Sequence, residues 1–272
     1  MRRLMLFLLA VLTAIVVYAF SEARRDPVVR RATIAMLGWP ESTPPMRVAL
    51  LSDIHIGGPA MPEWRLRRIV GQVNMLRPDL VLMAGDFISG EDPVAGARAA
   101  ARLGAPLSRL RARYGVVAVL GNHDHWTAPE MVRAQLAQAG VTVLENQVAR
   151  RGPLTIGGVG DAFTGHDRTA AVLAEMTRPG LIVTHSPAIV PQTSKGTLVL
   201  AGHTHCGQIM LPVIGVRLVM MTSPDRPLFD PKYRCGIIRR EGRVVVVTGG
   251  LGATTPFRIG APPDIWLLTL GP

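Results

Sequence analysis

Five short apolar runs in this chain each end on residues of the kind that bind metal ions. A buried strand that ends in a polar loop is how α/β proteins place chemistry at the carboxyl edge of a sheet. One such ending is common, but five in one chain are hard to explain as core or surface. The five endings, in chain order, are Asp53-Ile54-His55, Gly85-Asp86, Gly121-Asn122-His123-Asp124, His185 and Gly202-His203-Thr204-His205.

The side chains in these endings suit two neighbouring metal ions better than one. Asp53 and His55 are two residues apart, so both can face the same ion. The carboxylate of Asp86 can hold two ions through its two oxygens, although a lone Asp at such a place is usually a turn residue or a helix cap. Asn122 offers an oxygen ligand without adding charge. The set therefore predicts a two-metal site, with His185, His203 and His205 completing the imidazole ligands.

His123 and Asp124 form an adjacent imidazole and carboxylate pair. Such a pair is the arrangement expected of an oriented general acid, so we predict a catalytic role for both residues. Of the seven histidines in the chain, only His166 lies away from the strand endings.

The N-terminal segment is strongly apolar. Residues 4–20 contain only Thr13 and Tyr18 as polar members, and as a helix they would span roughly 26 Å, the short limit for crossing a bilayer. Arg2 and Arg3 precede the run, as in a secretory signal. An uncleaved anchor, a cleaved signal and a buried core helix all remain open.

The orientation of an anchored chain is also open. The arginines that follow the span outnumber the two before it, which favours a catalytic domain on the cytoplasmic face, whereas a signal-like start argues the reverse. We expect the inner membrane of a bacterium. The predicted organisation is an anchor or signal over 1–23, a juxtamembrane connector over 24–45 and one catalytic domain over 46–272.

The net charge of +11 invites a nucleic-acid interpretation. Only Lys195 and Lys232 are lysines, however, aromatic residues make up 5% of the chain, and no basic stretch is interleaved with aromatics. We therefore expect no nucleic-acid partner and a monomer. Two cysteines do not make a disulfide framework, so Cys206 is expected to be a small buried residue beside the site, with a thiolate ligand or redox switch as the alternative.

The periodicity along the chain alternates between strands and helices and then becomes rich in strands. Glu241-Gly242 is a hairpin signal, Gly140 ends a helix, and Thr127 with Glu130 has the spacing of a capping box. The predicted fold is α/β, with two mixed β-sheets packed as a sandwich and flanked by helices. Helices are expected over 62–77, 93–113 (in two pieces), 128–139 and 167–178, and strands over 47–52, 79–84, 115–120, 141–145, 154–159, 181–184, 197–201, 236–240, 243–248 and 265–270.

The order of the five endings resembles the calcineurin-like metallophosphoesterases, from residue 46 to about residue 271. The stretches LAGHTHCGQIMLP (200–212) and FRIGAPPDIWLLTL (257–270) are similar to a branch of bacterial membrane-associated phosphodiesterases, part of which is linked to cleavage of UDP-2,3-diacylglucosamine. One departure is Ser89, where many relatives carry an acid. That position is not a metal ligand in the family, so it bears on substrate choice.

The resemblance implies a ligand set for each ion. One ion would be bound by Asp53, His55, Asp86 and His205, and the other by Asp86, Asn122, His185 and His203. A hydroxide bridging the two ions would attack phosphorus, and His123, held by Asp124, would protonate the leaving oxygen. Manganese is the expected metal, with zinc or iron as alternatives.

The substrate is the least determined part. The apolar N-terminal run favours a phosphodiester or pyrophosphate in a lipid-linked amphiphile, such as UDP-2,3-diacylglucosamine. The alternatives are a phosphodiesterase or phosphatase acting on soluble nucleotides or phosphoproteins, and a non-catalytic scaffold of the same fold.

Overall fold

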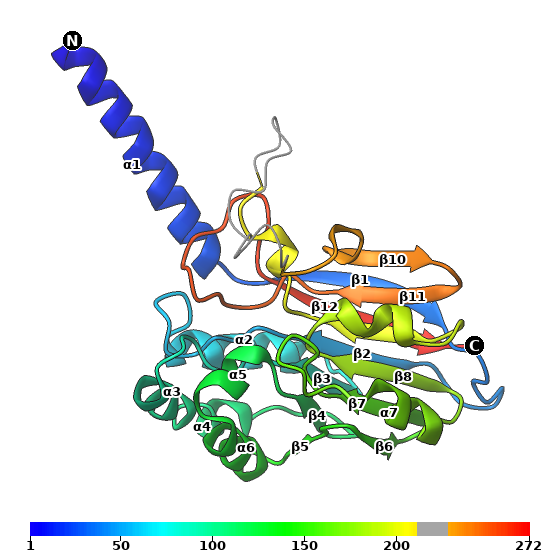
Figure 1. Cartoon of the computed structure of the whole chain (residues 1–272). Helices are drawn as coiled ribbons and strands as arrows, with labels where there is room; N and C mark the ends of the chain where they lie inside the picture. Colours follow the sequence, from blue (N-terminus) through cyan, green and yellow to red (C-terminus); the bar gives the residue numbers. More distant parts are fainter. Residues whose placement is uncertain (211–227) are drawn as a thin grey trace.

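The computed structural model describes residues 1–210 and 228–272, which form two facing six-stranded sheets with helices outside (Figure 1). The sheet orders are β1-β12-β2-β3-β4-β5 and β10-β11-β9-β8-β7-β6. Strands β2 to β5 run parallel in the first sheet, and β7, β8, β9 and β11 run parallel in the second. The predicted sandwich of two mixed sheets is confirmed.

The element bounds are as follows. The first sheet contains β1 (Val28–Ala35), β12 (Asp264–Gly271), β2 (Met46–Leu51), β3 (Leu80–Ala84), β4 (Val116–Val119) and β5 (Val141–Val143). The second contains β10 (Gly236–Arg240), β11 (Arg243–Val247), β9 (Leu198–Ala201), β8 (Gly180–Thr184), β7 (Leu154–Val159) and β6 (Gln147–Arg151). The helices are α1 (Arg2–Arg24), α2 (Glu63–Met75), α3 (Pro93–Ala100), α4 (Gly104–Leu107), α5 (Asn122–Thr127), α6 (Pro129–Gln138) and α7 (Thr169–Glu175), with short 3-10 turns η1 (Pro187–Gln192), η2 (His205–Gly207) and η3 (Pro231–Tyr233).

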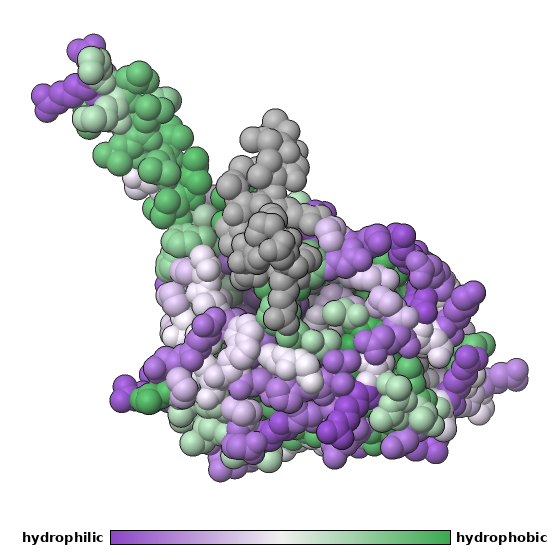
Figure 2. Space-filling view, in the orientation of Figure 1, coloured by the Kyte–Doolittle hydropathy of each residue, from purple (hydrophilic) through white to green (hydrophobic). Residues whose placement is uncertain are grey.

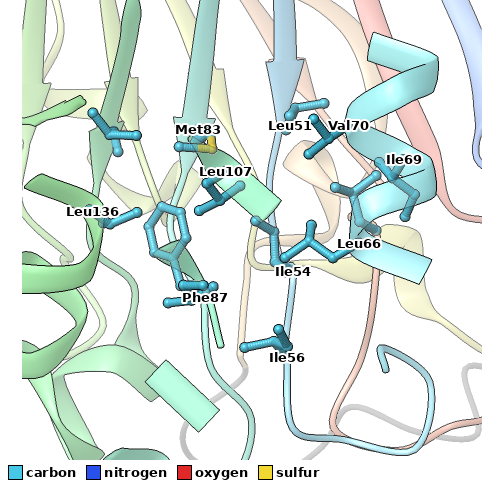
Figure 3. Close-up of a cluster of buried hydrophobic side chains, with 14 of the residues drawn as sticks. Leu51, Ile54, Ile56, Leu66, Ile69, Val70, Met83, Phe87, Leu107 and Leu136 are labelled. Atoms are coloured by element: carbon cyan, nitrogen blue, oxygen red, sulfur yellow. The ribbon is translucent and has the colours of Figure 1, made fainter. Parts of the chain in front are cut away.

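The two faces of the first sheet bury different sets of side chains. Because side chains alternate along a strand, Val48 and Leu50 of β2 pack into the layer between the sheets, while Ala49 and Leu51 pack under the helices. Figure 3 shows the helix-side layer, in which Leu51 lies beside α2. Both faces of the central strands are therefore apolar, and polar groups are left to the strand ends.

The structure differs from the expected connector over 24–45. Residues 28–35 form strand β1, which pairs in parallel with β12 from Val28 opposite Asp264 to Ala35 opposite Gly271. Its β-branched residues suit an extended edge strand, and Arg30 adds an ion pair of 2.7 Å between its Nε and Oδ2 of Asp264. The chain thus joins the sheet well before residue 46.

Local signals were right at some places and wrong at others. The hairpin at Glu241-Gly242 joins β10 and β11, and Gly140 follows the end of α6 with a positive φ of 76°. The predicted capping box is not formed. The side chain of Thr127 donates instead to the carbonyl oxygen of His123, within helix α5. Strand β6, an edge strand with few apolar residues, was not predicted.

Helix α1 projects from the domain, and its visible surface is almost entirely hydrophobic (Figures 1 and 2). Among the described residues it is the one helix long and apolar enough to cross a membrane. Only Ala19 and Ala23, near its C-terminal end, are buried against the domain.

Candidate metal centre

All seven predicted ligands come together where the parallel strands of both sheets end. Asp53 and His55 follow β2, Asp86 follows β3, and Asn122 follows β4, which are neighbours in the first sheet. The remaining ligands follow β8 and β9, neighbours in the second sheet. All seven side chains are buried or nearly so: Asp53, His55, Asp86, Asn122, His185, His203 and His205.

Apolar residues that alternate with the ligands fix the ligand loops to the core. Ile54 and Ile56 flank His55, and Phe87 follows Asp86, and all three point into the cluster under the helices (Figure 3). Each ligand loop therefore has one side in the core and the other in the site.

The backbone at the site is held in an uncommon conformation. Five of the seven ligands have a left-handed φ, between 48° and 69°, although none is glycine. Such residues cost on the order of 1 kcal/mol each and persist where surrounding contacts fix them. The bend of the chain between His203 and His205 is part of this pattern. The five are Asp53, His55, Asp86, His203 and His205.

One group of ligand atoms lies around Asp53. Nε2 of His205 lies 3.5 Å from Oδ1 of Asp53 and 3.3 Å from Nε2 of His55. The hydroxyl of Ser52 donates to the other oxygen of Asp53, which fixes the carboxylate. The side chains of Asp53, His55 and His205 are close enough to share one ion.

A second group lies around Asn122. Oδ1 of Asn122 lies 3.0 Å from Nε2 of His185 and 3.0 Å from Nδ1 of His203. Asp86 stands between the two groups, because its Oδ2 lies 3.5 Å from Nε2 of His55 and 3.3 Å from Nε2 of His185. A shared central carboxylate is the geometry of a paired-ion site.

Backbone carbonyl groups set which nitrogen of each histidine faces the site. Nδ1 of His55 lies 3.2 Å from the carbonyl oxygen of Ile88, and Nδ1 of His185 donates to that of Ala84 at 2.7 Å. In His203 the roles are reversed, since Nε2 donates to the carbonyl oxygen of Leu228 at 2.9 Å. Each ring thus turns its remaining nitrogen toward the other ligands, as metal-binding histidines do.

Burial sets the protonation of these imidazoles. It lowers the pKa of His55 to about 3 and that of His203 to about 4, and the pKa of His205 also lies well below its usual value. His185 differs: burial opposes its charge, but the charge and hydrogen bond of Asp86 raise its pKa well above the usual value. Three of the four imidazoles are therefore neutral at pH 7 and able to ligate.

The donor set fits divalent cations. The facing nitrogens of His185 and His203 are 3.2 Å apart, and each lies 3.0 Å from Oδ1 of Asn122, so a small cation could take the place of the proton on His185 among these three ligand atoms. Burial also raises the pKa of Asp53 to about 6, because its carboxylate is unfavourable there without a cation. Carboxylate, amide and imidazole ligands together suit manganese, iron or zinc.

The predicted pair of His123 and Asp124 is not formed. Oδ1 of Asp124 accepts from the backbone N–H groups of Phe87 (2.9 Å) and Ile88 (3.2 Å), and Oδ2 accepts from that of Gly121 (2.9 Å). His123 instead places its Nδ1 2.8 Å from the carbonyl oxygen of Gly90. The local reason is that helix α5 begins at Asn122, which turns successive side chains in different directions.

A comparison with protein families matches the calcineurin-like phosphoesterase model over residues 46–207. The chain belongs to this family. The match covers the five strand endings in the order in which the structure brings them together.

Two named relatives extend the comparison. A transmembrane protein with metallophosphoesterase domain from Danio rerio is 31% identical over 284 residues, which cover 96% of this chain and 61% of that protein. The chain therefore spans less than two thirds of that relative. Phosphodiesterase YaeI of Escherichia coli (strain K12) is 26% identical over 239 residues, covering 85% of this chain and 84% of that protein. Among solved structures, TT1561 of Thermus thermophilus is similar with a TM-score of 0.45 and 14% identity, over 76% of this chain and 90% of that chain.

Within this metallophosphoesterase domain, Cys206 is not the lone buried residue that was expected. It forms a disulfide with Cys235, next to the predicted ligand His205. The segment before Cys235 also holds the ligand loop, because the hydroxyl of Thr204 donates to the carbonyl oxygen of Arg234 at 2.6 Å. The bond therefore fastens the His203–His205 loop. Leu211 and Pro212, part of the stretch that suggested the phosphodiesterase branch, lie outside the described residues.

Sequence reasoning missed several residues beside the site. Arg258 is fully buried and places its guanidinium nitrogen 3.3 Å from Nδ1 of His205. Trp126 and Phe163 form an aromatic wall, with ring centroids 5.2 Å from His123 and 5.1 Å from His203 respectively. A buried arginine and an aromatic contact between distant loops leave no signal in a single sequence.

Asp161 was also missed, although its signal was visible. It follows β7 and Gly160, the same ending as that of Gly85-Asp86, and it is fully buried. Its Oδ2 accepts from the hydroxyl of Thr164 at 2.9 Å, while its Oδ1 has no hydrogen-bond partner among the described residues. Its charge raises the pKa of His203 against the effect of burial.

Proposed function

We propose that this chain is a phosphodiesterase that uses two divalent metal ions to hydrolyse a phosphodiester or pyrophosphate bond in a membrane-lipid-related substrate. Family membership and the phosphodiesterase relative support a metal-dependent phosphoester hydrolase. The observation that carries the two-ion assignment is Oδ2 of Asp86, which lies 3.5 Å from His55 and 3.3 Å from His185.

The distances between the side chains divide the proposed ligands into two groups that share Asp86. Asp53, His55 and His205 would hold one ion, Asn122, His185 and His203 the other, and Asp86 both. When bound, such ions neutralise charge on the phosphoryl oxygens and increase the acidity of water. Manganese is our first choice, with zinc and iron as alternatives to be separated by metal replacement.

His123 is proposed as the general acid. The carbonyl oxygen of Gly90 accepts from its Nδ1 at 2.8 Å, and this leaves Nε2 to donate a proton to the leaving oxygen. Its ring lies 5.1 Å from that of His55, so it stands at the edge of the ligand group. Asp124 is assigned to holding the loops of Phe87 and Gly121 rather than to proton transfer.

Helix α1 supports a membrane-anchored enzyme, which we place in the cytoplasmic membrane of a bacterium. The small residues that would mark a signal cleavage site lie in its last turns, where Ala19 and Ala23 are buried against the domain. A segment packed in this way belongs to the folded protein, which favours an uncleaved anchor. The relative from Danio rerio is itself named a transmembrane protein.

An amphiphilic substrate fits the aromatic wall. Trp126 is 42% exposed, and its ring packs edge-on against that of Phe163 at 5.8 Å, so the two rings form one apolar surface beside His123 and His203. UDP-2,3-diacylglucosamine, which contains a pyrophosphate, a planar base and acyl chains, is the specific candidate.

The test is an assay of the full chain in detergent with Mn²⁺. Bis-p-nitrophenyl phosphate, p-nitrophenyl phosphate and UDP-2,3-diacylglucosamine are compared, and we expect the diester and the lipid to be hydrolysed. Cleavage of the monoester alone would assign a phosphatase, and preference for soluble nucleotides would replace the lipid. His185→Ala should abolish turnover while His166→Ala, a change at an exposed histidine, should not. Turnover unaffected by His185→Ala would contradict the mechanism and place the reaction at another site, whereas no turnover of any substrate by the natural sequence would leave a non-catalytic scaffold.

A further inference from the structure

The C-terminal end of α1 is fixed to the domain by a buried arginine. Nε of Arg65 donates to the carbonyl oxygen of Arg24 at 3.0 Å, and one of its terminal nitrogens donates to that of Arg25 at 2.8 Å. The last carbonyls of a helix have no partner within it, so these bonds cap α1. The other terminal nitrogen of Arg65 donates to the carbonyl oxygen of Leu251 at 2.9 Å.

A second buried arginine, Arg258, contacts both α1 and the metal centre. The backbone N–H of Arg258 donates to the carbonyl oxygen of Ala19 at 2.9 Å. Its side chain donates to the carbonyl oxygen of Gly252 at 2.6 Å and lies 3.3 Å from Nδ1 of His205. One residue therefore contacts both the anchor and a proposed ligand.

The loop over 249–262 joins these two contacts. On its inner side the N–H groups of Leu251 and Gly252 donate to the carbonyl oxygens of Ser52 (3.0 Å) and Asp53 (2.7 Å). On its outer side, the ring of Phe257 lies 6.3 Å from that of Phe20 in α1. The loop is thus held between the anchor and the metal centre, and the direction of α1 is fixed relative to the site.

The surroundings of this helix end suit a bilayer surface. The guanidinium of Arg24 lies 5.2 Å from the ring centroid of Phe20 and 5.9 Å from that of Trp64. Trp64 is 54% exposed although it lies at the start of α2, beside the anchor. Tryptophan and arginine gather at the level of lipid headgroups, where a ring and a charge are both accommodated.

The length of α1 indicates where the lipid headgroups would lie relative to the domain. Residues 4–20 span roughly 26 Å as a helix, which nearly fills a hydrocarbon core of about 30 Å. The purple tip in Figure 2 marks the charged start of the helix, and the green surface extends from there to the domain. Arg24 and Trp64 then lie among the headgroups on the side of the domain.

We propose that the metal centre works at the headgroup level of the same bilayer that holds α1, on amphiphiles that stay in that bilayer during hydrolysis. This inference rests on the proposed phosphodiesterase function and adds where the substrate is presented. In the reaction, a water oxygen forms the new bond to phosphorus, and the bond from phosphorus to the leaving oxygen breaks. The leaving oxygen takes a proton from His123, the attacking water gives up a proton to solvent, and the lipid keeps a phosphomonoester.

The test compares one lipid substrate in two places. The full chain is reconstituted in phosphatidylcholine vesicles with a diacylglycerol that carries a p-nitrophenyl phosphodiester, either in the same vesicles or in separate ones. Release of p-nitrophenolate should be faster by about 100-fold or more when enzyme and lipid share a vesicle, because the anchor raises the effective concentration. Equal rates in the two arrangements would overturn the proposal.

A soluble substrate separates this proposal from the proposed function. Bis-p-nitrophenyl phosphate has the same leaving group and reports on every outward-facing site. If it is not hydrolysed with any metal, the phosphodiesterase assignment fails; if it is hydrolysed but the lipid shows no preference for the shared vesicle, only the membrane proposal fails.

Two matched variants refine the comparison. Trp64→Ala removes the exposed ring beside the anchor and should lower the lipid rate several-fold while hydrolysis of the soluble diester stays unchanged. Met75→Ala removes an exposed apolar side chain at the other end of α2, and it should change neither rate. Equal effects of the two changes on the rate of lipid hydrolysis would contradict a contact between Trp64 and the lipid headgroups.

Discussion

Nε2 of His185 lies 3.3 Å from Oδ2 of Asp86, and without a metal the two side chains form a buried ion pair. Burial favours the neutral forms, but the charge and hydrogen bond between them raise the pKa of His185 well above its usual value and bring that of Asp86 well below. At pH 7 a metal that binds His185 therefore has to displace its proton.

The first prediction is that metal binding at pH 7 releases about one proton per protein. Titration calorimetry in buffers of different ionisation enthalpy measures this number. Affinity for the ion should rise with pH up to the pKa of His185. His185→Asn should abolish the release, whereas His203→Asn should not, since burial lowers the pKa of His203 to about 4 and this ring is already neutral. A binding enthalpy that is independent of buffer would contradict the ion pair.

The second prediction separates His123 from its neighbour. His123→Asn should lower kcat by about 100-fold or more with an unchanged thermal midpoint, because it removes the proton donor. Asp124→Asn should cost about 1–3 kcal/mol of unfolding free energy, because an amide nitrogen cannot accept from the N–H of Gly121. Thermal unfolding and steady-state kinetics of both variants decide the matter. A stable Asp124→Asn variant without activity would restore the catalytic pair.

The third prediction concerns the close approach of two strand ends. A side-chain carbon at Gly121 would overlap the carboxylate and backbone nitrogen of Asp86, so Gly121→Ala has to displace the shared ligand. We expect metal affinity to fall by about 10–100-fold. Gly71→Ala, where no atom of the described residues lies within 4 Å of the added carbon, should leave affinity unchanged and stabilise α2 by up to about 1 kcal/mol. Similar metal affinities in the two variants would show that Asp86 is not fixed by Gly121.

The fourth prediction follows from the disulfide between Cys206 and Cys235, which are separated by 29 positions. Closing a loop of that length stabilises a protein by about 3–4 kcal/mol on the chain-entropy estimate, so Cys235→Ser should lose that amount and bind metal more weakly at His203. Reductant should reproduce the loss in the natural sequence and have no effect on the variant. Such bonds persist in oxidising compartments, so the catalytic domain is expected on the outer face of the membrane. Alkylation of both cysteines in intact cells without reductant would contradict this.

The meeting of the seven proposed ligands in one place could be predicted from sequence because each lies within four residues of the end of a buried strand. Strand identity and strand ending are local signals, and parallel strands bring their endings to one edge whatever the rest of the chain does. The roles of neighbours could not be predicted in the same way. Asp124 stands next to His123 in sequence, yet its oxygens face the N–H groups of Phe87 and Ile88, a contact that depends on how two loops pack.

The buried arginines show a second limit. Arginine is almost never fully buried without partners, so residue type alone gives no reason to place Arg65 and Arg258 in the interior. Their partners are backbone carbonyl groups of distant segments. Every residue has such a group, so the sequence does not show which ones an arginine will bind. Strand β1 was missed for the same reason, because its pairing with β12 joins opposite ends of the domain.

The backbone hydrogen bond from Arg258 to Ala19 makes the last turns of α1 part of the folded domain. A different apolar helix in place of α1 would not fit unless small residues stood where Ala19 and Ala23 now pack. Proteolytic shedding at this point would likewise leave Arg65 without two of its acceptors. Helix α1 and the catalytic domain thus form one packed unit, and replacing either would require the contact surface of the other to be rebuilt.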